Sequence, residues 1–374
     1  MADPAARSAP ARAAREPVVV SGLAVRSAAG SGVELLARTC AGSPAFQAVT
    51  RFDATGHRTR VAATLPGAPT LVDELAAVIE TACADAALDR ARRTGTPLLL
   101  AAHADRDNRA TAAEIARRTG MPTPSRVYTA ACVAATSAVA DAAAMIRAGH
   151  ADRVVVAAGY LVEPGTFALF DAGRTLARDG RVRPFSAGRQ GIVLGDAVAA
   201  VVLESATAAN RRGAPTQARL AGWGRTGDAY HVCQPRPDGG GLARAIDTAL
   251  RLAGVTPGEV GYVNANGTGT VFSDCAESAA LHRVFGADVA RLPVSSTKSV
   301  HGHALEASGL LEFALTVLAL RAGRLPVNAG FIQPDEACQL DLVLDEARET
   351  DTGYALSVNA AFGGANTALL VGAA

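Results

Sequence analysis

The chain has 374 residues, of which 49% are hydrophobic, so it can bury one large core or two of medium size. Its net charge of +1 at pH 7 gives no attraction toward nucleic acid or an anionic membrane, and its apolar runs are too short to span a bilayer. The 6 cysteines include no CxxC pair, which argues against a zinc site and a disulfide framework, so no metal is expected.

The first half of the chain alternates strands and helices. Residues 1–16 are rich in Ala, Arg and Pro and lack the apolar stretch of a signal peptide, which predicts a disordered tail and a cytoplasmic location. Strands that are apolar throughout are typical of a sheet covered by helices on both faces. Apolar runs predict strands at 17–25, 97–102, 153–159 and 197–204, and helical periodicity predicts helices at 32–41 and 70–87.

A polar link at 205–216 separates this half from a second one, in which the pattern begins again. The sequence therefore predicts an α/β protein with two strand-and-helix domains, at 17–210 and 211–374. In the second domain, strands are predicted at 217–224 and 261–264, helices at 240–254, 274–285 and 303–321, and a closing pair of strands at 354–359 and 367–371.

Cys132 lies between a predicted strand at 125–129 and an Ala-rich predicted helix at 133–149. Backbone N–H groups at a helix N-terminus carry partial positive charge, which favours the thiolate form of a cysteine placed there. Cys132 is therefore the candidate nucleophile. The alternative from these residues alone is an inert buried side chain, because a cysteine among alanines commonly packs as a small hydrophobe.

Three Gly-rich turns, at 264–270, 296–303 and 359–366, carry polar side chains that simple turns do not need. Their glycines permit positive φ and leave backbone N–H groups free to face a ligand. The second turn contains Lys298, the single lysine among 36 basic residues. Because arginine serves wherever charge alone matters, the lysine indicates a need for a compact ammonium group that a guanidinium fork cannot imitate, and the alternative is that it survived by chance.

Together these stretches resemble the β-ketoacyl-acyl carrier protein synthases, the ketosynthases that condense acyl chains in fatty-acid and polyketide pathways. The resemblance implies the thiolase fold, in which two pseudo-duplicated αβα halves form a five-layered αβαβα sandwich. It begins at about Val18 and rests on ordered motifs: VVVSGLAV at 18–25, the Cys132 turn, RPFS at 183–186, NANGTGT at 264–270, STKSVHGH at 296–303 and the Phe362 glycine loop.

The resemblance also implies roles for the candidate site residues. Cys132 would accept the acyl group from a pantetheine thioester, and His303 would stabilise the enolate formed on decarboxylation. The backbone N–H groups of Cys132 and Phe362 would hold the oxyanion of the acyl-transfer intermediate. Further site positions implied by the motifs are Asn266 and Lys298 beside the catalytic pair, Gly363 in the gating loop, and Glu312, Thr268 and Thr270 in support.

Two departures from the family pattern stand out. Asn266 replaces the first active-site histidine of the family motif, and Glu306 stands where the family has a glycine. Loss of that histidine usually impairs decarboxylation, although an amide N–H can also donate a hydrogen bond to a carbonyl. The asparagine therefore leaves the reaction that follows acyl transfer open.

Three interpretations follow. The first is an acyltransferase that loads an acyl chain onto Cys132 and forms a carbon–carbon bond in polyketide or fatty-acid-type specialised metabolism. The second keeps the acyl transfer without decarboxylation, as a transacylase or in an intramolecular aldol or lactone closure. The third is a non-catalytic partner like the chain-length factors, which Cys132 disfavours because those proteins replace the cysteine.

The same resemblance predicts the partners. No bound cofactor is implied, because substrates would arrive on the phosphopantetheine arm of an acyl carrier protein. The second subunit would be an identical chain or a second ketosynthase-like chain, giving a homodimer or a heterodimer. Neither nucleic acid nor a membrane is an expected partner.

Overall fold

The computed structural model describes residues 16–103, 108–124 and 126–374. Of the predicted tail only Glu16 lies within these ranges, and its carboxylate accepts a hydrogen bond from the Thr207 N–H at 2.8 Å. The rest of that tail lies outside the described residues. None of the described helices is long and apolar enough to cross a membrane.

The N-terminal half contributes five strands to the sheet, in the order β6-β5-β7-β8-β1. β6 and β7 run parallel to β5, whereas β8 runs antiparallel to both β7 and β1. The inner strands are buried over their whole length, because Val, Ala and Leu side chains pack on both faces. The bounds are β6 (Val127–Tyr128), β5 (Leu98–Ala102), β7 (Arg153–Tyr160), β8 (Ala197–Ser205) and β1 (Val18–Ser27).

The C-terminal half repeats this arrangement in the order β11-β10-β15-β16-β9. Again two parallel pairings are followed by two antiparallel ones, and β13 (Asp341–Leu342) extends the edge beyond β11. The two halves therefore share one topology. The bounds are β11 (Pro293–Ser295), β10 (Val260–Asn264), β15 (Tyr354–Ala360), β16 (Ala365–Gly372) and β9 (Ala218–Gly227).

The two sets of strands are joined along a short seam that the sequence did not predict. Only the first three residues of β1, Val18 to Val20, pair with β9. The pairing of β1 with β8 then shifts between Val20 and Gly22, which bends the strand. Beyond this bulge β1 follows β8 alone, and the two sets of strands separate to make room for helices between them.

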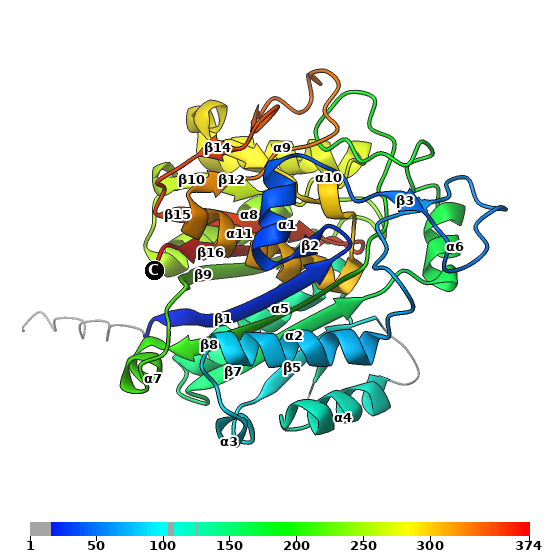
Figure 1. The fold of residues 1–374 in the computed structure, drawn as a ribbon. Coiled ribbons are helices and arrows are strands. Elements are labelled where there is room, and N and C mark those ends of the chain that lie inside the picture. The colour runs from blue at the N-terminus through cyan, green and yellow to red at the C-terminus, as the bar shows by residue number, and fades with distance from the viewer. Residues whose placement is uncertain (1–15, 104–107, 125) are drawn as a thin grey trace, which may run out of the picture.

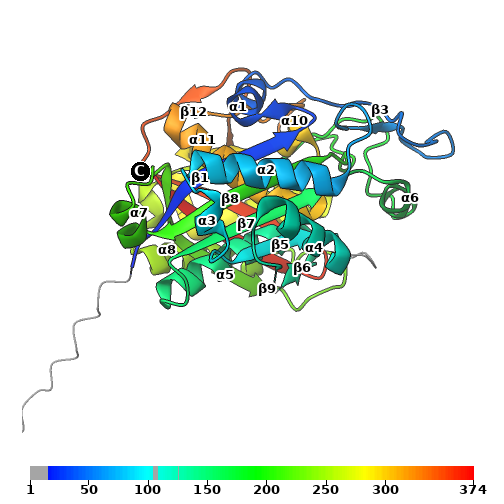
Figure 2. The ribbon, with the colours of Figure 1, turned by 60° about the horizontal axis from the view of Figure 1, so that its bottom comes forward.

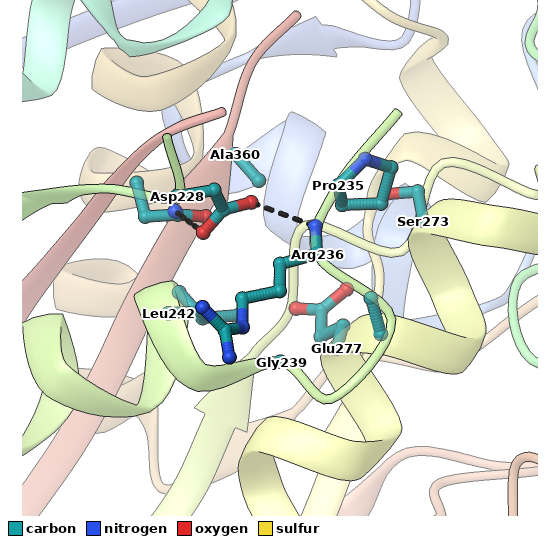
Figure 3. Close-up of a pocket in the computed structure, with 10 residues that line it drawn as sticks. Asp228, Pro235, Arg236, Gly239, Leu242, Ser273, Glu277 and Ala360 are labelled. Carbon is teal, nitrogen blue, oxygen red and sulfur yellow. Dashed lines mark hydrogen bonds between the residues drawn. The ribbon is translucent and has the colours of Figure 1, made fainter. Parts of the chain in front are cut away.

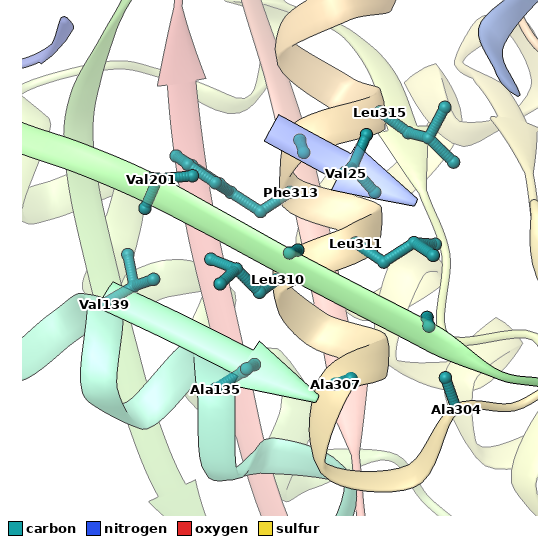
Figure 4. Packing of buried hydrophobic residues seen from close by; sticks show 14 of the residues in the cluster. Val25, Ala135, Val139, Val201, Ala304, Ala307, Leu310, Leu311, Phe313 and Leu315 are labelled. Carbon is teal, nitrogen blue, oxygen red and sulfur yellow. The ribbon is translucent and has the colours of Figure 1, made fainter. Parts of the chain in front are cut away.

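Two helices fill the middle of the molecule, α5 (Ala134–Arg147) and α11 (Ser308–Ala322). α5 packs on β7 and β16, and α11 packs on β8 and β15, so each helix contacts both halves. Figure 4 shows Leu310 and Phe313 projecting from α11 into the core shared with Val139 and Val201. Because α11 is buried on nearly all sides, its sequence is apolar around the whole helix.

Four further helices cover the outer faces (Figures 1 and 2). α2 (Leu71–Asp85) packs on β1 and β8 and carries α4 (Asn108–Thr119) on its side, whereas α8 (Gly240–Ala253) packs on β9 and β16 and contacts α9 (Val271–Phe285). The order of layers is therefore helix, sheet, helix, sheet, helix. This is the predicted five-layered sandwich.

Shorter elements complete the chain. The short helices are α1 (Gly32–Cys40), α3 (Arg90–Arg93), α6 (Pro164–Ala172), α7 (Ala206–Arg211) and α10 (Lys298–His301). The 3-10 turns are η1 (Ala131–Val133), η2 (Pro257–Glu259), η3 (Gly286–Arg291) and η4 (Leu305–Ala307). The two-residue strands are β2 (Gly30–Ser31), β3 (Gln47–Ala48), β4 (Val61–Ala62), β12 (Arg324–Leu325) and β14 (Arg348–Glu349).

The sequence-based prediction placed the start of one helix wrongly and missed two helices. The long helix predicted from His303 begins at Ser308, because Gly302 and Leu305 have φ of 77° and 42° and divide the preceding residues into two short turns. α4 and α6 were not predicted. α4 is strongly polar on average and shows little of the apolar periodicity on which the predictions depended.

Candidate active site

Cys132 lies on η1, between β6 and α5. The sequence predicted a helix directly after the strand, but Ala131 adopts φ of 48° and turns the chain before α5 begins at Ala134. Only 8% of Cys132 is exposed. Because η1 packs against η4, β15 and β16, the thiol lies where the two halves of the protein meet.

The Cys132 thiol is protonated at neutral pH in the unliganded protein, contrary to the expectation from its place before a helix. Burial, followed by the charge of Glu306, raises the pKa of Cys132 to about 12, while the charge of Lys298 opposes the rise. Burial therefore counts against the thiolate at a position where the N-terminus of α5 would favour it. The thiolate fraction at neutral pH is small in the unliganded protein.

Lys298 is enclosed, and its ammonium group joins several partners at once. Nζ forms an ion pair with Glu312 Oε1 at 2.7 Å and donates to the backbone oxygen of Asn266 at 2.8 Å. The second oxygen of Glu312 accepts from Asn359 Nδ2 at 2.6 Å. These contacts diverge from one point, which suits a compact ammonium better than a planar guanidinium.

Asn266 is buried in the turn that follows β10, and its backbone is clamped by Glu277. The N–H groups of Asn266 and Gly267 each donate to the Glu277 carboxylate at 2.7 Å. Its side-chain oxygen, Oδ1, lies 3.3 Å from Lys298 Nζ, and Nδ2 donates to Ser273 Oγ at 3.4 Å. With Oδ1 held by the ammonium group, Nδ2 is the atom of this amide that can donate to a substrate.

His303 is buried, and its hydrogen bonds define its protonation. The Leu305 N–H donates to Nδ1 at 3.0 Å, so this ring atom is an acceptor. Burial, assisted by the charge of Lys298, holds the pKa of His303 well below its ordinary value, and the ring is neutral. A neutral ring that accepts at Nδ1 carries its proton on Nε2, so His303 can donate a hydrogen bond from Nε2.

His301, two residues earlier, has both ring nitrogens engaged. Nδ1 lies 2.7 Å from the Gly302 backbone oxygen, and Nε2 lies 3.0 Å from Thr297 Oγ1. Burial lowers the pKa of His301 to about 3. It is a satisfied core histidine that holds the turn in shape, which leaves His303 as the ring with a free donor.

The remaining predicted positions lie around this cluster. The hydroxyl oxygens of Thr268 and Thr270 are 2.9 Å apart. Phe362 is 51% exposed and stacks on Phe170, with ring centroids 6.1 Å apart. Gly363 follows with φ of 85°, and its N–H donates to the Val232 backbone oxygen at 2.9 Å. Phe362 and Gly363 therefore belong to a surface loop, whereas the two threonines lie deeper.

A small pocket borders the Asn266 turn through Ser273 and Glu277 (Figure 3). Asp228 lies across from them, and hydrogen bonds from neighbouring chain segments hold its carboxylate. Cys132 does not line this pocket. The pocket therefore approaches the polar network from the Asn266 side and does not mark the position of the thiol.

Sequence reasoning missed two contacts at the site. Asn359 begins the glycine-rich turn at 359–366, and nothing in the sequence marks it as the partner of Glu312. His103 Nδ1 lies 2.9 Å from Glu306 Oε1, and no local pattern links residues 203 positions apart. Among the residues that the structure describes, no group of three or more His, Cys, Asp or Glu side chains could hold a metal ion.

Family models identify the chain from both of its halves. The model for the N-terminal domain of β-ketoacyl synthases matches residues 78–209, and the model for the C-terminal domain matches residues 217–331. The chain belongs to the β-ketoacyl synthase family. The resemblance inferred from the sequence motifs is thereby confirmed, and most of this β-ketoacyl synthase chain falls within the two matched regions.

Two relatives of this β-ketoacyl synthase are similar over about two thirds of its length. The 3-oxoacyl-[acyl-carrier-protein] synthase 2 of Staphylococcus aureus is 36% identical over 258 residues, which cover 67% of this chain and 64% of the relative. Nodulation protein E of Rhizobium leguminosarum bv. trifolii is 41% identical over 253 residues, which cover 67% of this chain and 62% of the relative. The chain thus spans less than two thirds of these relatives.

Two solved structures share the fold of this β-ketoacyl synthase. The ishigamide ketosynthase/chain length factor has a TM-score of 0.89 at 30% identity, covering 96% of this chain and 100% of that one. A β-ketoacyl synthase from Burkholderia phymatum STM815 has a TM-score of 0.86 at 28% identity, with the same coverage of 96% and 100%. The predicted thiolase fold is therefore confirmed.

Proposed function

We propose that this β-ketoacyl synthase homologue is an acyltransferase that takes an acyl chain from a carrier-protein thioester onto Cys132 and then forms a carbon–carbon bond. The observation that carries the proposal is the cluster itself. The turn that carries the buried Cys132 packs against η4, and the C-terminal half holds a neutral histidine donor, His303, and the ammonium network of Lys298. A relative named as an acyl-carrier-protein synthase supports a carrier-bound substrate.

The first step exchanges one thioester for another. The Cys132 sulfur attacks the carbonyl carbon of the pantetheine thioester, the bond to the pantetheine sulfur breaks, and the Cys132 proton leaves with that sulfur as a thiol. The charge that develops on the carbonyl oxygen needs nearby donors, for which we propose the backbone N–H groups of Cys132 and Phe362. Because the thiol begins protonated, moving this proton is part of the barrier.

The second step consumes a malonyl-type extender thioester. The bond to its carboxylate breaks with release of carbon dioxide, and the electron pair forms an enolate whose oxygen accepts from His303 Nε2–H. The enolate carbon then attacks the acyl group on Cys132, so a carbon–carbon bond forms and the carbon–sulfur bond breaks. Cys132 leaves as a thiolate and takes up a proton from water, which restores the thiol. The Nδ1 contact with the Leu305 N–H keeps His303 in the tautomer that this donation requires.

A second candidate function is acyl transfer without decarboxylation, followed by transfer of the acyl group or by an intramolecular aldol or lactone closure. Asn266 favours it, because a long hydrogen bond at 3.4 Å ties Nδ2 to Ser273 and the ammonium group of Lys298 faces Oδ1. One N–H of this amide is then left for the extender carbonyl, in place of the imidazole donor that the family has at this position. A chain-length-factor-like partner without catalysis is the third candidate, and the presence of Cys132 opposes it.

One experiment separates the first two candidates. Malonyl-carrier protein is incubated with the wild type and with Asn266→His, and release of carbon dioxide is measured. A condensing enzyme releases carbon dioxide in the wild type at a rate that Asn266→His does not raise. If only the histidine variant releases it, the proposal of condensation fails and acyl transfer alone remains.

For this chain the partners also remain proposals. We propose an acyl carrier protein as the donor and a second ketosynthase-like subunit, identical or different, as in the neighbour named as a ketosynthase/chain length factor. Gel filtration with multi-angle light scattering would give the mass of the assembly. A cytoplasmic location is likewise kept as a prediction from the sequence.

A further inference from the structure

We propose that Glu306 and His103 form a polar recognition site for the acyl group on Cys132, and that this chain selects acyl groups bearing a hydrogen-bond donor near the thioester. The inference rests on the proposed acyl transfer, because the acyl group concerned is the one carried by Cys132. It depends on residues outside the network of Lys298 and His303.

Glu306 is placed beside the nucleophile by two short turns. It lies on η4, and η4 packs directly against η1, the turn that carries Cys132. The charge of Glu306 raises the pKa of the Cys132 thiol, which agrees with a place close to the sulfur. An acyl chain bonded to the Cys132 sulfur therefore begins next to this carboxyl group.

Among the described residues, only one oxygen of the Glu306 carboxyl group has a hydrogen-bond partner. Oε1 lies 2.9 Å from His103 Nδ1, and because a carboxylate only accepts, the imidazole donates. Oε2 is buried, and in the described part of the chain no donor reaches it. Only 4% of Glu306 is exposed. A buried carboxylate oxygen without a donor is unfavourable, so a ligand that supplies one is stabilised.

His103 gives the buried carboxylate of Glu306 a hydrogen-bonding partner. His103 directly follows β5, and its side chain is 42% exposed. Its ring meets the Tyr160 ring edge-on, with the ring centroids 6.5 Å apart. The imidazole contacts one oxygen of Glu306, and the other oxygen is buried. A plain alkyl group would press hydrocarbon against this oxygen, whereas a hydroxyl or amino group would donate to it.

The test measures acylation of Cys132 by three pantetheine thioesters, of butanoate, 3-hydroxybutanoate and 3-aminobutanoate, from initial rates of adduct formation in intact-protein mass spectra. We expect the wild type to prefer one of the donor-bearing groups over butanoyl by about ten- to a hundredfold. The hydroxyl and amino arms distinguish a neutral from a cationic donor. A wild type that takes butanoyl equally fast overturns the proposal.

The variants separate recognition of the acyl group by Glu306 from a purely structural role of this residue. Glu306→Leu removes the acceptor and should abolish the preference, whereas His103→Asn, which can still donate to Oε1, should keep most of it and His103→Leu should weaken it. The control is Asp341→Asn on the edge strand β13, which breaks the ion pair between Asp341 and Arg348 and should leave the preference unchanged. A preference that survives Glu306→Leu overturns the proposal.

A second measurement does not depend on acyl transfer. Cys132 is modified with 2-hydroxyethyl methanethiosulfonate and with propyl methanethiosulfonate, in which the Cys132 sulfur displaces methanesulfinate and forms a disulfide, and only the polarity of the tail differs. The hydroxyl reagent should react faster in the wild type and lose this advantage in Glu306→Leu. If no thioester acylates Cys132, the proposed function fails, and the ratio of the two modification rates still decides this inference.

Discussion

The two halves of the molecule share one strand order but supply opposite kinds of side chain to the site. The segment after β6 supplies Cys132, a sulfur among apolar neighbours, and the matching segment after β11 supplies Lys298 and His303. In the C-terminal half Lys298, Glu312 and Asn359 are already paired with one another. The comparison teaches that the nucleophile depends for its polar surroundings on elements of the other half, so neither half forms the site alone.

The largest effect is expected for Cys132→Ala, which removes the thiol that the N-terminal half supplies to the site. We expect complete loss of acyl-adduct formation, because no other thiol lies on η1, the turn at which the two halves meet. Intact-protein mass spectrometry after incubation with acyl thioesters measures it. Cys338→Ala, which removes a buried thiol from the C-terminal core, should still be acylated. An adduct that persists in Cys132→Ala would show that the reactive sulfur is elsewhere.

His303→Ala tests the contribution of the C-terminal half to the chemistry. Loss of the Nε2–H donor should slow release of carbon dioxide from malonyl-carrier protein by about 10²- to 10⁴-fold while acylation of Cys132 persists in part. The two assays are run on the same preparation. His282→Ala, at a histidine that lies on the exposed side of α9, is the control. Equal loss in both assays would argue against a separate role in decarboxylation.

Lys298→Met tests whether the paired groups of the C-terminal half also stabilise the fold. Removing one member of a buried ion pair leaves the Glu312 charge uncompensated and should lower the free energy of unfolding by about 3–5 kcal/mol. Urea denaturation measures it. The double variant Lys298→Met with Glu312→Gln should lose less, because neither charge then remains. A double variant as unstable as the sum of the single ones would contradict this account.

The smallest effect concerns the apolar surroundings that the N-terminal half gives its thiol. Because the pKa of Cys132 is raised to about 12, its thiolate fraction should grow about tenfold per pH unit, with no plateau between pH 7 and 9. The rate of iodoacetamide alkylation, followed by peptide mass spectrometry, reports this fraction. The exposed Cys233 serves as an internal control. A plateau for Cys132 below pH 9 would mean that the thiol is acidic after all.

The sequence by itself determined the architecture and the identity of the candidate site. Apolar runs predicted the main strands, because a strand covered on both faces needs hydrophobic side chains at every position. The polar glycine turns and the single lysine pointed to the segments that meet at the centre of the molecule. These are local signals, carried by neighbouring residues, and they can be recognised without knowing what lies across the core.

Only the tertiary structure decided the electrostatics of the site. The high pKa of Cys132 arises from burial and from Glu306, the pairing of Glu306 with His103 joins distant segments, and the seam between β1 and β9 depends on a bulge. The first two depend on how far a group is from water and on which charge is nearest, and the seam depends on which strands lie side by side. Burial and distance are properties of the packed chain, so no local pattern of residues could have predicted them.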